Sequence, residues 1–395
     1  MTVESGRVAL IIDGRVFDRW TSVDVGRDLR EIAGTFSLRL LDKGRFPGAT
    51  APRINRGDAC TVAIDGETVL SGWIDVVEIN EEGDTLDMSV QGRDVTGDLV
   101  DSAAAPDGPA EYRNIDLLAF ATAICKPFSI PVKADIDVGA PFDTLSLQPH
   151  DKALEAIESA ARQRSALVTS DGVGGLLLTR GGITRAPASL VRGGNIAGLH
   201  RRDDGTHRFS DVYVKGQSAR GAGCRRGSRA AASLATTPSA PTTPAGTASA
   251  GILITGHAQD PGVTRYRPFV KLTRSQSGMT SAQEQAEWLV RVFQGQALEL
   301  DYRVLDWRAG EPSGTGPVPQ LGALWRPNTV VPVYDPLVDI AGDMLIAGAR
   351  YQMSDKGLLT QLRIVGLSAY EQVNEAYHRR AAFQPQVQPS PRRRR

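Results

Sequence analysis

The residues best suited to bind a metal ion, the histidines, are scattered along the chain. No HExxH helix, Cys/His cluster or EF-hand loop brings several of them together. Zinc and calcium sites need several ligands at defined spacings, and an isolated histidine supplies only one. We therefore predict no metal site and no cofactor, and interpret each of the five histidines as an isolated residue: His150, His200, His207, His257 and His378.

One polar segment contains the three residue types of a hydrolytic triad. His207 precedes Ser210 and Asp211 by a few residues, so a base, a nucleophile and an orienting acid are all present. The nucleophile-elbow pattern GxSxG is absent from the chain. Serine, histidine and aspartate are also common in polar loops, and we interpret this segment as such a loop.

Two further patterns suggest chemistry at first reading. Glu78, Glu81 and Glu82 could supply the carboxylate pair of a glycosidase, but neighbouring acids at a hairpin tip are typical of solvated surface. Gly172–Gly175 and Gly221–Gly227 are glycine-rich, yet neither stretch follows a strand and opens a helix as a phosphate-binding loop does. We predict no catalytic or cofactor-binding residue, and a protein that is not an enzyme.

The charge balance argues against a protein that grips nucleic acid through a broad basic surface. The chain has 45 basic and 45 acidic residues and a formal net charge of zero. Basic runs occur in only two places, where they could contact DNA phosphates or an acidic partner, or remain solvated. They are Arg220, Arg225, Arg226 and Arg229, and the terminal Arg392–Arg395.

Cysteine usage and hydropathy indicate a protein made in the cytoplasm. Cys60, Cys125 and Cys224 are odd in number and show no CxxC spacing, so we expect them to be reduced. Asp13 interrupts the only apolar run near the N-terminus, and no run of eighteen apolar residues occurs anywhere. We predict no signal peptide and no stable membrane insertion.

Two hairpins, one near each end of the chain, share a pattern. The first has a β-branched strand at 73–79, a turn at 81–84, and inward Leu86, Met88 and Val90. The second has a turn at 354–357 followed by inward Thr360, Leu362 and Ile364. The inward positions fall at the same offsets from Gly83 and Gly357, although the spacing back to Gly72 and Gly348 differs by two residues. We interpret the pair as a duplicated β unit, with chance resemblance between two hairpins as the alternative.

The predicted fold class is α+β, mainly β, with two similar antiparallel β-barrel units and inserted α/β modules. A helix beginning at Asn114, a second beginning at Asp151 and a capping box at Ser281 belong to the inserted segments. The predicted domains are a first β-barrel unit (1–103), an α/β module (104–195), a second β-barrel unit (196–373) and a disordered tail (374–395). The second unit contains a flexible insertion at 217–250 and a helix-strand segment at 280–304.

A collinear set of segments resembles the baseplate hub proteins of Mu-like contractile-tailed phages. The order and spacing of these segments, each short by itself, cover nearly residues 1–373, while the insertion at 217–250 and the tetra-arginine end depart from the family pattern. The segments are VQGRDVTGDLVDSA (90–103), ALEAIESAARQRSALVTSDGVGGLLLTR (153–180), RYRPFV (265–270), LWRPNTVVPVYD (324–335) and MLIAGARYQMSDKGLLTQLRI (344–364).

The resemblance implies a structural hub in the tail baseplate of a virion, assembled in the host cytoplasm. It implies a homotrimeric ring that adapts a six-fold tail tube above to a three-fold spike protein below and surrounds the path of passing DNA without binding it specifically. Contacts with other baseplate proteins are expected, and no spike-like repeat follows, so the spike is expected to be a separate protein. The alternatives are the hub of a phage-derived injection machine (a tailocin or a secretion system), a tail-associated cell-wall hydrolase, and carbohydrate-binding β modules.

Overall fold

The computed structural model describes residues 6–43, 53–148, 150–218, 252–272, 279–309, 322–355 and 357–371. The chain divides into two compact units, one formed by residues up to Thr206 and from Gln294 onward, the other by residues 207–293. The expected flexible insertion, apart from residues 217 and 218, and the expected disordered tail lie outside the described residues.

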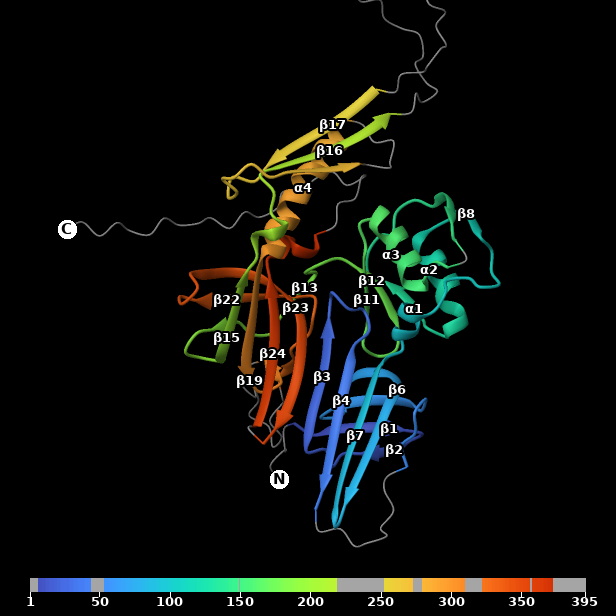
Figure 1. The fold of residues 1–395 in the computed structure, drawn as a ribbon, viewed down its shortest axis with the longest axis vertical. Coiled ribbons are helices and arrows are strands. Elements are labelled where there is room, and N and C mark those ends of the chain that lie inside the picture. The colour runs from blue at the N-terminus through green and yellow to red at the C-terminus, as the bar shows by residue number, and fades with distance from the viewer. Residues whose placement is uncertain are drawn as a thin grey trace, which may run out of the picture. The chain divides into compact units, whose positions relative to one another are not determined.

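The first β unit is entirely antiparallel. Alternating apolar residues turn one face of each strand to the interior, and the strands pair in the order β3-β4-β7-β6-β5-β1-β2 (Figure 1). Leu86, Met88 and Val90 are buried, as their alternation predicts. The strands are β1 (Val8–Ile12), β2 (Arg15–Phe17), β3 (Ser22–Asp28), β4 (Thr35–Asp42), β5 (Ala59–Ile64), β6 (Glu67–Glu82) and β7 (Thr85–Asp94).

The second β unit lies in the same compact unit and has the order β15-β19-β24-β23-β22. Thr360, Leu362 and Ile364 are buried, which confirms the inward positions predicted for the second hairpin. Its strands are β15 (Ile196–Asp203), β19 (Leu298–Leu305), β22 (Thr329–Asp335), β23 (Ile340–Ser354) and β24 (Gly357–Val365). Two short strands, β13 (Thr184–Arg185) and β14 (Leu190–Val191), pair with β22 in parallel. A further short pair, β20 (Arg308–Ala309) and β21 (Ala323–Leu324), follows β19 in sequence.

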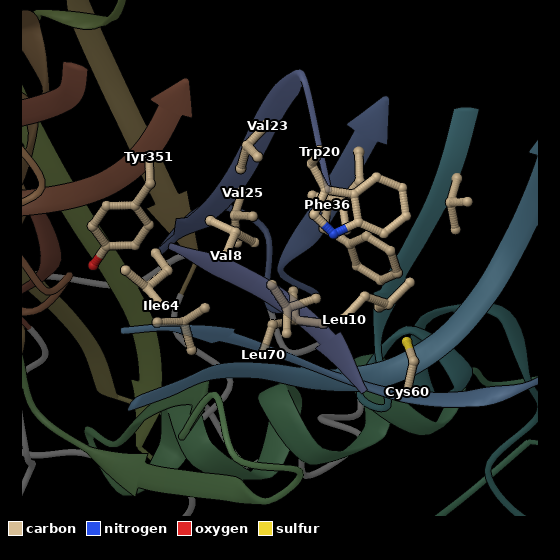
Figure 2. Close-up of a cluster of buried hydrophobic side chains, with 14 of the residues drawn as sticks. Val8, Leu10, Trp20, Val23, Val25, Phe36, Cys60, Ile64, Leu70 and Tyr351 are labelled. Carbon is tan, nitrogen blue, oxygen red and sulfur yellow. The ribbon is translucent and has the colours of Figure 1, made fainter. Parts of the chain in front are cut away.

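Pairing of β3 with β23 joins both β units into one fourteen-stranded sheet. Among the described strands no pairing connects the two ends of either unit, so closure into barrels stays a prediction. The core of the first unit gathers side chains from β1, β3 and β4, including Val8, Leu10, Val25 and Phe36, together with Tyr351 of β23 (Figure 2). The two β units therefore share one hydrophobic core where they meet.

An α/β module follows β7 and has its own core of alanine, leucine and isoleucine side chains. The predicted apolar face of its longer helix is confirmed, since Ala153, Ile157, Ala160 and Ala161 are each at most 1% exposed. Its elements are α1 (Gly97–Asp101), β8 (Glu111–Ile115), α2 (Leu117–Cys125), η1 (Lys126–Phe128), β9 (Val132–Ala134), β10 (Phe142–Ser146), α3 (Ala153–Gln163), β11 (Leu167–Ser170) and β12 (Leu176–Thr179).

Two predicted helix starts in this module are wrong. Asn114 lies in β8 with a positive φ of 47°, and Asp116 is the residue that caps α2, accepting a hydrogen bond from the Ala119 amide at 2.7 Å. The N-cap of α3 is Lys152, because Asp151 uses its carboxylate to accept from the Gln148 amide. Asn114 and Asp116 can both cap a helix, so the sequence alone does not choose between them, whereas α3 begins one residue later than predicted, after an N-cap lysine whose side chain makes no cap.

The unit of residues 207–293 packs a three-stranded sheet against a long helix. Val212 and Val214 of the sheet contact the face of Ala282, Ala286 and Leu289, and these apolar helix positions were predicted. The helix begins at Met279, so Ser281 lies within it and the predicted capping box is wrong. The elements are η2 (Gly205–His207), β16 (Asp211–Ser218), β17 (Ile252–Gln259), β18 (Pro268–Leu272) and α4 (Met279–Ala297), and η3 (Leu367–Tyr370) ends the described chain in the larger unit. None of the described helices is long and apolar enough to cross a membrane.

Candidate assembly site

The two hairpins predicted to be duplicates have the same backbone geometry. In β6–β7 the register shifts between Ile74 and Val76, and in β23–β24 it shifts between Ile346 and Gly348. Ile74 precedes the end of β6 at Glu82 by the same number of residues as Ile346 precedes the end of β23 at Ser354. A bulge at a matched position is a specific feature that a generic pair of hairpins would not share.

The strands around each hairpin repeat as well. The order β3-β4-β7-β6-β5 of the first unit corresponds strand by strand to β15-β19-β24-β23-β22 of the second. The registers agree: Phe36 faces Gly92 in the first unit, and Leu300 faces Ile364 at the corresponding place in the second. One chain therefore contains two copies of a five-strand arrangement, with the α/β module and residues 207–293 inserted.

The first copy is attached to the second through what we call the closed junction, the pairing of β3 with residues Gly348–Met353 of β23. Gln352 donates a hydrogen bond from Nε2 to Asp24 Oδ2 at 3.1 Å, and Arg350 Nε lies 3.3 Å from Asp24 Oδ1. The Leu29 amide continues the contact by donating to the Ala347 carbonyl at 2.8 Å. Carboxylates of the first unit thus meet amide and guanidinium groups of the second.

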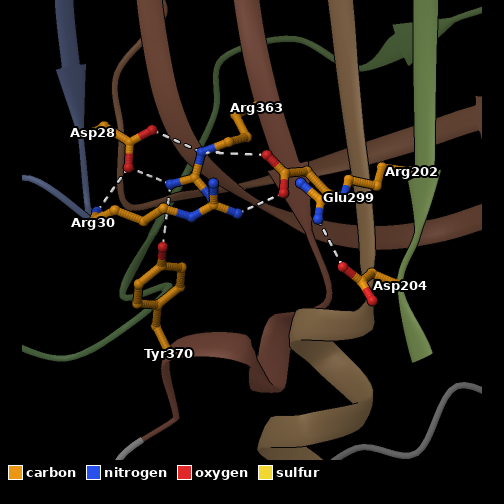
Figure 3. A network of polar contacts seen from close by, with 7 residues as sticks. All are labelled: Asp28, Arg30, Arg202, Asp204, Glu299, Arg363 and Tyr370. Atoms are coloured by element: carbon orange, nitrogen blue, oxygen red, sulfur yellow. Dashed lines mark hydrogen bonds and ion pairs between the residues drawn. The ribbon is translucent and has the colours of Figure 1, made fainter. Parts of the chain in front are cut away.

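A network of charged side chains lies at one end of the closed junction (Figure 3). Arg363 Nε donates to Asp28 Oδ2 at 2.7 Å, and Arg363 Nη2 also donates to Asp28 and to the Tyr370 hydroxyl. Arg30 forms an ion pair with Glu299, which lies 4.0 Å from Arg363 Nε. Burial acts to lower the pKa of Arg363, but the hydrogen bond with Asp28 and the interactions with Tyr370 outweigh it, so that pKa is raised. Arg363 stays charged and links three elements.

A polar cleft of about 280 Å³ lies over the same junction. Its lining includes Arg27, Arg30, Asp301, Arg350 and Arg363. Burial, and then the neighbouring Glu299, raise the pKa of Asp301. The cleft marks where the two β units meet, and Arg30, Arg350 and Arg363 in its lining already take part in the ion pairs described above.

Within the two repeated five-strand arrangements, two strand edges have no strand partner among the described residues, and we call them the open edges; β2, outside the repeat, is a further edge strand. One is the second half of β6, residues 76–82, which pairs with β7 on one side only. The other is β15, the outermost strand of the second unit. Val76 and Ile79 on β6 are 41% and 48% exposed. Unpaired, partly apolar edges are a liability that proteins cover or use for assembly.

A buried charged group stabilises the second β unit from within. Asp335 is fully buried and accepts from Arg192 through Nε at 3.0 Å and Nη2 at 2.6 Å, and from the Tyr302 hydroxyl at 3.0 Å. The Arg192 hydrogen bond, which outweighs burial, holds the pKa of Asp335 below its ordinary value. This group ties the loop before β15 to β19 and β22.

A second buried carboxylate ties the α/β module to the first β unit. Asp94, only 1% exposed, accepts from the Ser170 hydroxyl at 2.7 Å and the Thr96 amide at 2.8 Å, while Arg27 donates to the Ser170 carbonyl. Burial raises the pKa of Asp94 and lowers that of Arg27. The contact fixes the module on the sheet.

Comparison with known proteins assigns these β units to a family. The chain is 30% identical over 332 residues to the baseplate hub protein gp44 of Escherichia phage Mu, covering 83% of this chain and 79% of that protein. The chain belongs to the baseplate hub family of Mu-like phages. Family models match in chain order: Mu phage baseplate assembly protein GpP-like, N-terminal, at residues 7–94; baseplate hub protein gp44-like, second domain, at 96–180; and GpP, fourth domain, at 278–372.

Solved structures agree with this hub family. The 43 kDa tail protein of prophage MuSo2 from Shewanella oneidensis is 28% identical, with a TM-score of 0.74 over 93% of this chain and 100% of that one. A tail protein from Neisseria meningitidis, 19% identical, has a TM-score of 0.71 over 93% and 99% of the two chains. A component of the E. coli type VI secretion system shares the fold alone, with 8% identity and a TM-score of 0.52 over 92% and 78%.

The structure does not assemble the triad considered for Ser210 and Asp211. The Ser210 hydroxyl donates to Asp211 at 2.8 Å, and the histidine beside Asp211 is His257 at 3.0 Å, whose ring stacks on Tyr213, whereas His207 is exposed. Hydrogen bonds from Gln259, Ser210 and His257 lower the pKa of Asp211. Ser210 contacts the Asp211 carboxylate, and the histidine lies on the far oxygen of that carboxylate instead of on the serine, so the arrangement is a hydrogen-bonded polar cluster and not a triad.

The other residues considered for chemistry are also dispersed. His150 and His200 are exposed, and His378 lies outside the described residues. Across the described ranges no group of three or more His, Cys, Asp or Glu side chains could hold a metal ion. In the loop Gly172–Gly175, Asp171 accepts the amides of Val173 and Gly175, so the loop is closed on itself as a turn.

The predicted acidic turn needs one correction. β6 continues through Glu82, so Glu81 and Glu82 belong to the strand and the connection begins at Gly83. Glu78, Glu81 and Glu82 are exposed, and consecutive strand residues face opposite sides, which separates Glu81 from the other two.

Cys60 and Cys125 are buried free thiols, and burial raises the pKa of each to about 12. Cys224, Gly221–Gly227 and the basic runs of the insertion and tail lie outside the described residues.

Proposed function

We propose that three copies of this chain form a ring that adapts the six-fold tail tube to the three-fold spike. The observation that carries the proposal is the strand-by-strand repeat of β3-β4-β7-β6-β5 in β15-β19-β24-β23-β22. A trimer of such chains presents six similar β units around its axis, while every feature that occurs once per chain repeats three times. Closed symmetry requires interfaces that match in this way.

The ring acts as a passive conduit in this proposal. The six β units contact the tail tube or its initiating protein on one side, and the once-per-chain parts contact a separate trimeric spike and other baseplate proteins. The formal net charge of zero suits a channel that surrounds passing DNA without specific binding. No catalytic step is needed, and the dispersed polar groups described above support a hub that is not an enzyme.

The hub of a phage-derived injection machine is the alternative. The shared fold with a type VI secretion component supports it, and the mechanical role of the ring would be the same. Sequence identity to the Mu hub over most of the chain favours the phage tail. Neighbouring genes for capsid and DNA packaging would separate the two.

Light scattering of the purified chain over a wide concentration range tests the ring. We expect a mass three times that of the 42.3 kDa chain, and images of the particle showing six similar β units. A mass of one chain at every concentration, also in the presence of the spike protein, would contradict the proposal. Clearing of purified peptidoglycan in a zymogram would contradict the non-enzymatic role.

A further inference from the structure

We propose that neighbouring copies of the chain join by antiparallel pairing of β15 of one copy with residues 76–82 of β6 of the next. This inference rests on the proposed ring and names the surface that would close it. The two open edges are the counterparts of the two strands that already pair at the closed junction. β15 corresponds to β3, and the second half of β6 corresponds to the second half of β23.

The register between copies follows from the closed junction. Within the chain, Gln352 faces Asp24 and Arg350 faces Gly26. In the strand correspondence, Asn80 takes the position of Gln352 and His200 takes the position of Asp24, so Asn80 and His200 face each other across the new pairing. In the same way, Glu78 takes the position of Arg350 and Arg202 takes the position of Gly26.

The transferred register brings opposite charges together. Glu78 lies directly opposite Arg202, where facing side chains on antiparallel strands interact most strongly. On the other sheet face, Arg201 lies opposite Ile79 and diagonal to Glu81. Asp203 lies opposite Val77, and this pair adds no charge complementarity. The residues involved on both edges are exposed or half-buried in the single chain.

The charges at the open edges are arranged opposite to those at the closed junction. At the closed junction the acid, Asp24, is on β3 and the base, Arg350, is on β23. At the open edges the bases are on β15 and the acids on β6. Wrong pairing of β15 with another copy's β23 would place Arg202 directly opposite Arg350, two like charges. Reversed signs of this kind select the correct partner edge.

Existing ion pairs on β15 do not block this exchange. Arg202 Nη2 lies 2.7 Å from Asp204, and Arg201 Nη2 lies 3.2 Å from Asp203. The side chains of Arg202 and Arg201 are 65% and 42% exposed, and exposed surface pairs of this kind are weak and screened by solvent. Among the described residues no ion pair engages Glu78, Glu81 or Glu82, so the acids of β6 are available.

The pairing is head-to-tail, because one copy offers β15 and the next offers β6. Such contacts form either a closed ring or an open filament, depending on the rotation between copies. If the new pairing has the geometry of the closed junction, each chain contributes two similar steps of rotation. Three chains close into a ring when each of the six steps is one sixth of a turn, and this is the rotation that the proposed trimer requires.

A cysteine trap tests the register. In the full chain carrying Cys224→Ser, we combine Asn80→Cys with His200→Cys, which face each other, so their Cβ atoms fall within disulfide reach. Mild oxidation should give covalent dimers and trimers on a non-reducing gel. The matched control pairs Asn80→Cys with Arg201→Cys, which point to opposite sheet faces in this register and should crosslink at least tenfold less.

Charge reversal provides an independent readout. Glu78→Lys should shift the mass measured by light scattering from trimer toward monomer, as should Arg202→Glu, and the double variant E78K/R202E should recover the trimer. Asp107→Lys, an exposed acid in the α/β module, is the control for net charge. Circular dichroism confirms that each variant is folded before its mass is measured.

The outcomes separate this interface from the ring itself. A trimer without the Asn80–His200 crosslink, and with no response to Glu78→Lys, overturns the interface and leaves the ring. A crosslinked open polymer supports the strand pairing and overturns the closed trimer. Since oxidation also traps transient encounters, a monomer that never crosslinks overturns both.

Discussion

The closed junction and the open edges show one backbone arrangement with two different sets of side chains. At the closed junction, where β23 pairs with β3, β23 presents Ala349 and Tyr351, which are 2% and 4% exposed and pack into the cores of the second and the first unit. The corresponding positions of β6 are the half-buried Val77 and Ile79, which is 48% exposed. The repeated strand order gives both β23 and β6 an edge that can pair with a further strand. The side chains at these edges differ, and only the edge of β23 is paired with a strand of the same chain.

The cores of the two β units differ in the same way. The first unit places Phe36 opposite Gly92, and the second places Leu300 opposite Ile364. Where the first unit has the buried Ile64, the second has the buried Asp335, hydrogen-bonded to Tyr302. An aromatic ring over a glycine and a pair of aliphatic residues fill the same space, whereas the buried carboxylate has no counterpart and requires dedicated partners.

The largest expected effect comes from removing that carboxylate. Asp335→Ala leaves the Tyr302 hydroxyl without its acceptor and Arg192 without its partner, so we expect a loss of about 3 to 5 kcal/mol in the free energy of unfolding. Urea unfolding followed by tryptophan fluorescence measures it. Adding Tyr302→Phe to the variant should recover about 1 kcal/mol. A loss below 1 kcal/mol would mean that the group contributes little.

The glycine of the first unit should be nearly as intolerant. A Cβ at Gly92 would lie 2.1 Å from the Trp73 carbonyl oxygen and 2.6 Å from the Phe36 ring, so backbone must move. We expect Gly92→Ala to cost about 2 to 3 kcal/mol. Gly342→Ala in β23 is the matched control, because nothing lies within 4 Å of its added Cβ. Equal unfolding midpoints for the two variants would contradict this account.

Breaking the closed junction should have a smaller effect. Arg363→Ala removes the shared partner of Asp28 and Tyr370, and we expect a loss of about 2 kcal/mol because the Asp28 side chain is 32% exposed and partly solvated. Arg350→Ala, whose side chain is 50% exposed, should cost less than about 1 kcal/mol. If both substitutions cost the same, the network around Arg363 is not what stabilises the junction.

Sequence patterns predicted the hairpins but not their alignment. Alternation identified Leu86, Met88 and Val90 as inward because burial on one face imposes period two. Aligning Gly83 with Gly357 was misleading, since Gly83 follows the end of β6 directly, whereas Gly357 is the first residue of β24. Glycine with positive φ suits both places, and only the matched bulges show the correct correspondence.

The groups that connect parts of the chain could not be predicted from the sequence. Asp28 and Arg363 lie 335 residues apart, and Asp94 and Ser170 lie 76 apart. Sequence periodicity shows which apolar residues share a face, but it does not show which carboxylate will meet which guanidinium or hydroxyl group. These pairs form only once the chain has folded. The acids at 78–82 were interpreted as solvated surface, which describes the single chain correctly and says nothing of what a second copy would bring.

The smallest expected effect concerns those acids and sharpens the contrast with the closed junction. Glu78→Lys should change the unfolding free energy of the isolated chain by less than about 0.5 kcal/mol, because Glu78 is exposed and engages no ion pair among the described residues. Unfolding is measured at the lowest usable concentration, since assembly stabilises the folded state by mass action. A substitution at the closed junction lowers the unfolding free energy of the single chain, whereas a substitution at an open edge weakens only the association between copies. A loss of 2 kcal/mol in the dilute chain would show that β6 is already covered within its own chain.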